Sequence, residues 1–101
     1  MSKSLSLLDA ASGFAAMGAP ARLDIIRLLV RAGHQGLTIT TIRERLGIPA
    51  STLAHHLECL VQANLIQQSK QGRTCLNVAH FQHLENLAAF LLHECCKDEN
   101  P

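Results

Sequence analysis

The stretch "IPASTLAHHLECLVQANLI", residues 48–66, decides the fold of this chain of 101 residues. Pro49 suits the start of a helix, because the first amide groups of a helix are unpaired and proline has no amide proton to leave unpaired. Apolar residues then recur at three- and four-residue intervals and share one face: Leu53, Leu57 and Leu60. We therefore expect an amphipathic helix that buries its leucines and ends at Asn64, a residue that tolerates a left-handed helix end.

The face opposite these leucines carries short side chains that form hydrogen bonds. Ser51 and His55 point directly away from the core, Thr52 lies beside them, and His56 lies nearer the core boundary. Hydroxyl and imidazole groups in a row at the start of a helix are suited to base edges and phosphates. We expect this row to bind DNA; the alternative is an ordinary solvated helix face.

The preceding segment, "TITTIRERLG" at 38–47, predicts a shorter helix that ends at Gly47. Its apolar residues share one face: Ile39, Ile42 and Leu46. Two short helices in succession are typical of a helix-turn-helix, in which the first supports the second in the major groove of DNA. We assign this motif to residues 38–63, with Arg43 as a further contact to DNA.

The following segment, "LIQQSKQGRTCLNVA", predicts a β-hairpin over 65–78 whose strands flank a turn at residues 70–73, with Gly72 supplying the turn conformation. Its tip carries Lys70 and Arg73, which suit contacts to phosphates or the minor groove. In its second strand, alternation places Cys75 on the outward face together with Arg73. A hairpin directly after a helix-turn-helix predicts a winged helix-turn-helix.

Three further helices complete the expected domain, which is mainly α with a β-hairpin wing. They cover residues 5–17, 21–33 and 80–96, so the element order is α-α-α-α-β-β-α in a single domain over 1–101. Apolar residues form 48% of the chain, a large share for its length, which predicts that some are buried between subunits. We expect a homodimer.

Charge and cysteine content narrow the class of partner. Residues 38–80 have a net charge of +2, whereas residues 81–101 have a net charge of −3, so an anionic polymer is expected to meet the middle of the chain. No apolar run approaches the roughly 20 residues that span a bilayer, and the N-terminus does not resemble a signal peptide. Four cysteines without such a signal predict a reduced, cytoplasmic protein with no membrane association.

These segments together resemble the ArsR/SmtB family of dimeric metal-sensing repressors. The resemblance rests on "MGAPARLDIIRLLV", "ITTIRERLGIPASTLAHHLECLVQANLI" and "QGRTCLNV", and it covers residues 14–96. It implies a repressor that binds double-stranded operator DNA as a homodimer and leaves it when an inducer binds. It also implies dimer contacts through the first and last helices, 5–17 and 80–96.

Three sensor sites of this family are incomplete in the chain. The arsenic site of the first helix of the helix-turn-helix needs cysteines, and residues 37–47 contain none. The zinc pattern of the last helix, D-x-H-x10-H-x2-E, retains only His80 and Glu94, because Val78 and Leu91 occupy the other two positions. The redox pair of the family needs a cysteine on the second helix, which has none.

The stretch "HECC" at 93–96 of this chain resembles a fourth type of sensor site, at the end of the last helix in family members that bind trivalent arsenic or antimony. The resemblance implies arsenite or antimonite as the inducer ligand at Cys95 and Cys96, with no cofactor required. Soft thiolates favour such thiophilic elements. Those members carry a third cysteine a few residues further on, which this chain lacks; Cys75 or Cys59 remain as candidates.

Other interpretations of the same residues stay open. The protein can be a thiol-responsive, redox-responsive or divalent-metal-responsive repressor of the same fold, or a winged-helix DNA-binding protein without sensing. Cys95 and Cys96 can also be two tolerated thiols at a helix end. Catalysis by Cys95 with His93 is not expected, because residues two apart on a helix face apart, so we do not expect an enzyme.

Overall fold

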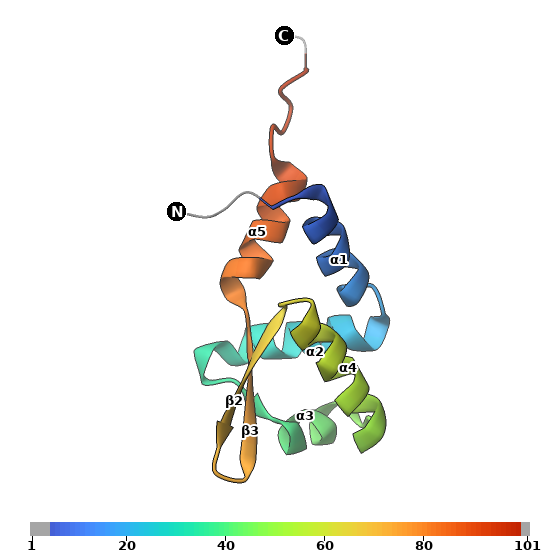
Figure 1. Cartoon of the computed structure of the whole chain (residues 1–101), viewed down its shortest axis with the longest axis vertical. Helices are drawn as coiled ribbons and strands as arrows, with labels where there is room; N and C mark the ends of the chain where they lie inside the picture. Colours follow the sequence, from blue (N-terminus) through green and yellow to red (C-terminus); the bar gives the residue numbers. More distant parts are fainter. Residues whose placement is uncertain (1–4, 100–101) are drawn as a thin grey trace.

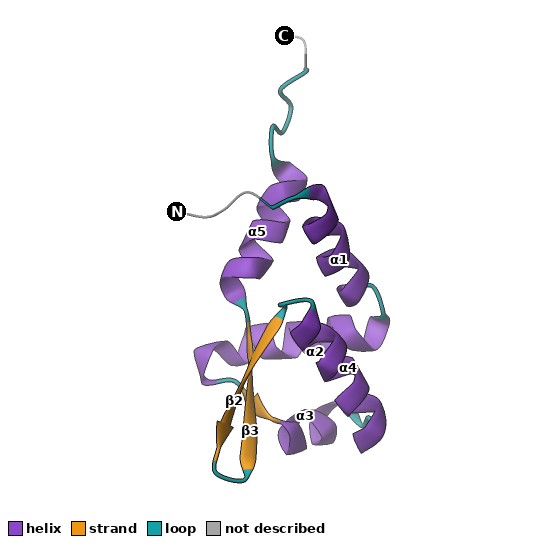
Figure 2. Cartoon of the chain, in the orientation of Figure 1, coloured by secondary structure: helices purple, strands orange, loops and turns teal. Residues whose placement is uncertain are grey.

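The computed structural model describes residues 5–99, and the ends of the expected domain, residues 1–4 and 100–101, lie outside this range. Helices, strands and one short 3₁₀ turn follow one another in nine elements (Figures 1 and 2). They are α1 (Leu7–Met17), α2 (Pro20–Ala32), η1 (Gly33–Gln35), β1 (Leu37–Thr38), α3 (Ile39–Leu46), α4 (Ala50–Gln62), β2 (Ile66–Gln71), β3 (Thr74–Ala79) and α5 (Phe81–Leu92). The predicted mainly helical fold with a hairpin wing is confirmed.

The molecule is elongated, measuring 56 × 27 × 23 Å along its principal axes. Figure 1 shows α1 and α5 side by side in its upper half and α3, α4 and the β2–β3 hairpin in its lower half, with α2 crossing between them. The chain continues beyond α5 as an irregular segment that extends away from the body. The two candidate sites of the sequence, the polar row on α4 and the cysteine pair, therefore lie at different ends of the protein.

The core lies between α2, α4 and the hairpin. The three leucines of α4 are buried as predicted, and they meet Ile25, Ile26 and Leu29 of α2 in one apolar cluster. Turn residues end the helices as expected: Gly47 after α3 has φ 65° and Asn64 after α4 has φ 64°, both left-handed. The core therefore holds the helix-turn-helix of residues 38–63 in place, and left-handed residues end each of its two helices.

The wing forms with a shorter turn than predicted and with an additional strand. β2 and β3 pair antiparallel from Ile66↔Ala79 to Gln71↔Thr74, so only Gly72 and Arg73 make the turn. Strand β1 pairs with the other edge of β3 through Leu37↔Asn77, giving the sheet order β1-β3-β2. Gly36 permits this approach, because a Cβ there would lie 2.4 Å from the carbonyl oxygen of Asn77.

The predicted outward face of β3 is wrong. Asn77 is fully buried and Cys75, on the same face, is half-buried, because β3 contacts the helices α2 and α3 and the η1 turn. The buried side-chain amide of Asn77 has hydrogen-bond partners: Nδ2 donates to the carbonyl of Leu37 (3.2 Å), and Oδ1 accepts from Gln68 Nε2 (2.8 Å). Cys75 consequently faces the protein interior instead of solvent.

The last helix is shorter than predicted, since α5 ends at Leu92 and not at Cys96. His93 has an extended conformation, and Glu94 and Cys96 have positive φ of 62°. Every side chain from Leu91 to Glu99 is exposed. Because short helical segments are marginal without packing, nothing stabilises a helix beyond Leu92.

Candidate nucleic-acid interface and thiol pair

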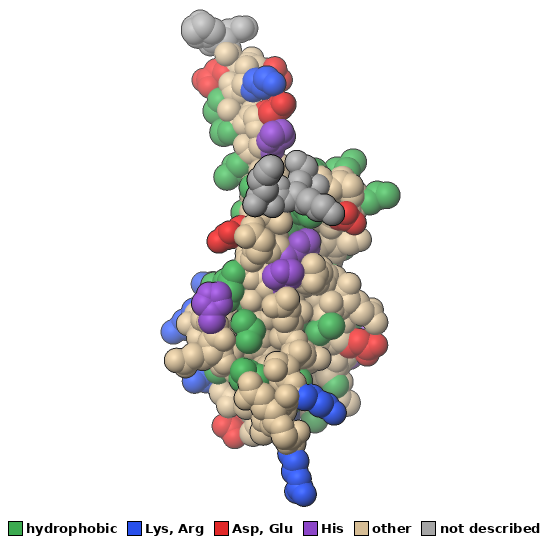
Figure 3. Space-filling view, turned by 60° about the vertical axis from the view of Figure 1, so that its left-hand side comes forward, with side chains coloured by type: hydrophobic (Ala, Val, Ile, Leu, Met, Phe, Trp, Pro, Cys, Tyr) green, Lys and Arg blue, Asp and Glu red, His purple; other side chains and the backbone are tan. Residues whose placement is uncertain are grey.

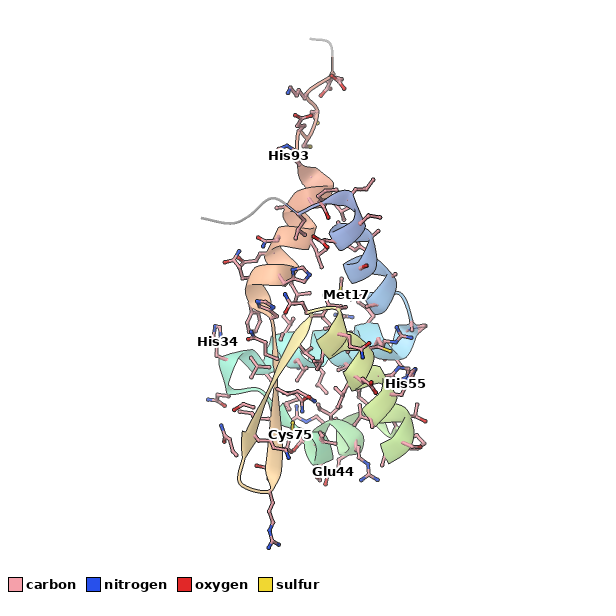
Figure 4. All side chains as sticks on the ribbon, viewed as in Figure 1. Met17, His34, Glu44, His55, Cys75 and His93 are labelled. Carbon is pink, nitrogen blue, oxygen red and sulfur yellow. The ribbon has the colours of Figure 1, made fainter. Side chains whose placement is uncertain are left out.

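The predicted DNA-reading row lies on the free side of α4. Ser51, Thr52 and His55 are exposed, whereas Leu53 on the opposite face has no exposed surface. Figure 4 shows His55 on the outer side of α4. Because the core fixes the rotation of α4 about its axis, these side chains are presented in one direction and not as a mobile set.

His56 occupies a different environment from its neighbour His55. It is half-buried, and its Nδ1 accepts a hydrogen bond from Arg22 Nε (3.3 Å) on α2. The same guanidinium donates through Nη1 to the carbonyl of Ala16 (3.1 Å) in the last turn of α1. Burial, the Arg22 cation and His55 together lower the pKa of His56, which favours the neutral imidazole that this bond requires.

Arg22 therefore joins α1, α2 and α4, a role that the sequence interpretation missed. Arg22 and His56 are 34 residues apart in the sequence. No local pattern marks such a contact, because it depends on how α2 crosses α4. The structure places His56 in this internal link, while Ser51, Thr52 and His55 remain on the open surface.

Basic side chains lie at the same end of the molecule as the start of α4. Lys70 and Arg73 are exposed at the tip of the hairpin, and Arg43 is exposed on α3. Figure 3 shows Lys and Arg side chains at the lower end of the molecule. An open groove of about 480 Å³ at the α3–α4 junction lies between Arg43, Glu44 and Pro49. This arrangement offers an anionic polymer several cations around the polar row.

The cysteine pair lies in the segment after α5. The sulfur atoms of Cys95 and Cys96 are 3.5 Å apart, and both side chains are exposed. Hydrogen bonds to Cys95 and then to Glu99 raise the pKa of Cys96, because they stabilise the protonated thiol. Lys97 and Glu94 form an ion pair of 3.1 Å beside the thiols. The two sulfurs thus meet beyond the end of α5, in a segment that is not helical.

The expected third ligands do not join this pair. Figure 4 shows Cys75 between the hairpin and α3, far from His93 and the segment after α5. Cys59 lies on α4 beside His55. Within residues 5–99, no group of three or more His, Cys, Asp or Glu side chains is arranged to hold a metal ion. Neither Cys59 nor Cys75 therefore completes a three-sulfur site with Cys95 and Cys96 in the described part of the chain.

The remnant of the zinc pattern is also divided. His80 precedes α5 and donates from Nδ1 to the carbonyl of Asn64 (3.0 Å), whereas Glu94 follows α5 and pairs with Lys97. The 12 residues of α5 separate them by about 18 Å. One ion cannot bind both side chains of the same chain.

Fold and site together define a DNA-binding protein of the winged helix-turn-helix class. The family model described as "Helix-turn-helix domain" matches residues 17–69. An uncharacterized helix-turn-helix-type transcriptional regulator of Methanocaldococcus jannaschii is 36% identical over 63 residues, covering 62% of this chain and 68% of that protein. The transcriptional repressor PagR of Bacillus anthracis is 34% identical over 68 residues, covering 67% of this chain and 66% of PagR.

The solved structures define the family more narrowly. An ArsR-like transcriptional regulator from Rhodococcus sp. RHA1 superposes with a TM-score of 0.75 at 25% identity, covering 90% of this chain and 82% of that one. The chain belongs to the ArsR family of helix-turn-helix transcriptional regulators. This confirms the expectation of a regulator and not an enzyme. Among residues 5–99, no helix has the length and apolar character needed to cross a bilayer.

Proposed function

We propose that the protein is a homodimeric repressor that leaves its operator when trivalent arsenic or antimony binds Cys95 and Cys96. The observation that supports the DNA-binding part most strongly is the division of α4. Its leucines are buried, and its exposed face carries Ser51, Thr52 and His55 at the same end as the basic wing tip. In this proposal α4 enters the major groove, while Lys70 and Arg73 contact the backbone or the minor groove.

The homodimer is proposed from the apolar surface of α1 and α5. Leu7 and Leu8 on α1 are 72% and 80% exposed, and Leu91 and Leu92 on α5 are both 67% exposed. Figure 3 shows hydrophobic side chains on the surface of the upper part of the molecule, where α1 and α5 lie. Large apolar side chains gathered at one end mark an interface. A second copy on this face leaves both α4 helices free for DNA.

The ligand is proposed from the geometry of the thiols. Two sulfurs that bind one centre at about 2.3 Å stand roughly 3.8 Å apart at a tetrahedral angle, and closer together at the narrower angle of a pyramidal trivalent metalloid. Cys95 and Cys96 are already at 3.5 Å. Arsenous acid condenses with two thiols, forming two As–S bonds and releasing two water molecules, so the reaction consumes both thiol protons. A small-molecule thiol in the reduced cytoplasm supplies the third sulfur in the same way.

Release of DNA is proposed to pass through the dimer. Cys95 lies three residues from Leu92, at the end of the exposed apolar surface of α5. A bound metalloid fixes the conformation of this segment and alters how the two α5 helices meet. Because two recognition helices must stand about 34 Å apart to reach successive major grooves, a change in this contact lowers operator affinity.

The experiment requires an operator and four ligands. We would select operator fragments from random DNA with the reduced protein, label one, and follow its release by fluorescence anisotropy with arsenite, antimonite, Cd²⁺ and Zn²⁺ separately. The proposal predicts that arsenite and antimonite each release the operator when all four titrations use the same protein concentration. Release by Cd²⁺ or Zn²⁺ without release by arsenite or antimonite would instead favour a divalent-metal repressor, and no release by any of the four would remove the metalloid function.

A further inference from the structure

A second pair of metal-binding side chains lies on the recognition helix itself. His55 and Cys59 are one helical turn apart on α4, and the imidazole Nε2 of His55 lies 3.8 Å from Cys59 Sγ. His55 is exposed and Cys59 is half-buried, so solvent reaches both groups. Residues four apart on a helix face the same side, and the backbone of α4 therefore holds this contact in place.

The spacing of the two donor atoms matches a chelate. A tetrahedral zinc ion has Zn–N of about 2.1 Å and Zn–S of about 2.3 Å, which places nitrogen and sulfur about 3.6 Å apart. The observed 3.8 Å is close to that value. An ion can consequently bridge the two atoms with small side-chain rotations and without bending α4.

We propose that His55 and Cys59 bind a divalent cation of borderline or soft character, such as Zn²⁺ or Cd²⁺. Imidazole and thiolate together select these ions over Mg²⁺ and Ca²⁺, which prefer oxygen ligands. On binding, the cation displaces the thiol proton of Cys59 to solvent and takes the free lone pair of His55. Water completes the coordination, because no third side-chain donor is arranged there within residues 5–99.

The location of the pair gives the ion a direct effect on DNA, an inference that rests on the proposed role of the α4 face. Ser51, His55 and Cys59 follow one another at four-residue intervals along the helix. A metal on His55 occupies the ring nitrogen that would otherwise meet a base or phosphate, and its water ligands fill the adjacent space. Metal and operator therefore exclude each other at the same surface.

The first test measures metal binding in the absence of DNA. A Cys75→Ser, Cys95→Ser, Cys96→Ser variant leaves Cys59 as the one cysteine of the chain. Titration of this reduced variant with Cd²⁺ should produce the ultraviolet charge-transfer absorption of a cadmium thiolate at one ion per protomer. Mg²⁺ should produce no change.

Matched variants assign the signal to the pair. Adding Cys59→Ser should abolish the thiolate band, and adding His55→Gln should weaken Cd²⁺ binding by roughly 10–100-fold or more, the loss seen even for supporting residues of metal sites. Circular dichroism of each variant checks that α4 remains helical, and Cys59→Ala serves if the serine variant does not fold. An unchanged Cd²⁺ affinity in the His55→Gln variant would overturn the chelate.

The second test adds the selected operator to the same variant. If binding is exclusive, Cd²⁺ at 100 times its own Kd should weaken operator binding by about 100-fold, and the operator should weaken Cd²⁺ binding reciprocally. Binding of Cd²⁺ to the free protein without competition would retain the metal site but contradict the placement of DNA on this face. Absence of Cd²⁺ binding would overturn the metal site and leave the DNA proposal intact.

Discussion

The helix α4 and the segment that follows α5 carry the two candidate sites, and they are built in opposite ways. Leu53 and Leu60 of α4 are fully buried, so the packed core determines the direction of its polar side chains. Residues 93–99 have no buried side chain and are held by local turns, such as Cys95 N–H to the carbonyl of Leu92 (2.9 Å). A DNA-reading surface needs rigidity before its partner arrives, whereas a ligand sensor needs a segment that its ligand can rearrange.

The largest expected effect is on stability, and it comes from removing a buried side chain of α4. Leu53→Ala removes a fully buried side chain and should lower the free energy of unfolding by about 2–5 kcal/mol, measured by urea denaturation. The control is Leu91→Ala on exposed α5, which should leave the helical signal intact but weaken dimerisation in sedimentation equilibrium. Equal loss of unfolding free energy in the two variants would contradict the assigned difference in packing.

The polar row on α4 tests recognition directly. Ser51→Ala and His55→Ala should each weaken binding to the selected operator by about 1–3 kcal/mol, the range for a contact to a base edge. Fluorescence anisotropy on specific and scrambled DNA measures the effect, and specific binding should suffer more. Gln82→Ala on exposed α5 is the control, and a similar loss in that variant would show that α4 is not the reading surface.

The wing should contribute charge more than sequence readout. Replacing Lys70 and Arg73 by Ala should reduce the slope of log affinity against log salt by about 1 for each lost phosphate contact. Specific and scrambled DNA should be affected alike, because phosphate contacts carry no sequence information. An unchanged salt slope would place the wing away from the DNA.

The smallest expected effect concerns the internal link between α4 and α2. Because the pKa of His56 is lowered from 6.5 in the folded protein, the unfolded state takes up the proton first as the pH falls. This link should therefore stabilise the protein above pH 6.5 and lose that contribution as the pH falls from 6.5 toward the lower folded pKa.

Urea denaturation at about pH 7.5 and about pH 5.5 measures the difference. The pKa of His83 is also lowered by burial and by His80, and His83 is present both in the wild type and in a His56→Gln variant. Subtracting the His56→Gln variant from the wild type therefore isolates His56, since glutamine retains an acceptor for Arg22. Identical pH dependence in the two proteins would contradict the link.

How far the sequence predicts each region follows from the same contrast. The leucine spacing on α4 and the stop at Asn64 report a buried face and a left-handed turn, which are local properties, and both were predicted correctly. The inward position of Asn77 on the face of Cys75 was missed, because it depends on long-range contacts of β3 with α2, α3 and η1. The Arg22–His56 bond was missed for the same reason.

The end of α5 was predicted less well than its core. Leucine spacing continues to Leu92, and the apolar character of the cysteines suggested a helix as far as Cys96. Every side chain from Leu91 to Glu99 is exposed, and the residues after Leu92 form turns. Helix ends depend on tertiary contacts as much as on propensity, so the sulfur–sulfur contact of 3.5 Å became evident only in the structure.

The most direct test of the metalloid-responsive repressor is release of operator by arsenite in wild type and in the Cys95→Ser, Cys96→Ser variant, measured by fluorescence anisotropy. Both proteins should bind DNA equally without ligand, and arsenite should weaken wild-type binding by about 5–150-fold, the range of allosteric coupling. The variant should remain bound. Release of the variant at the wild-type arsenite concentration would contradict the assignment of the sensor to Cys95 and Cys96.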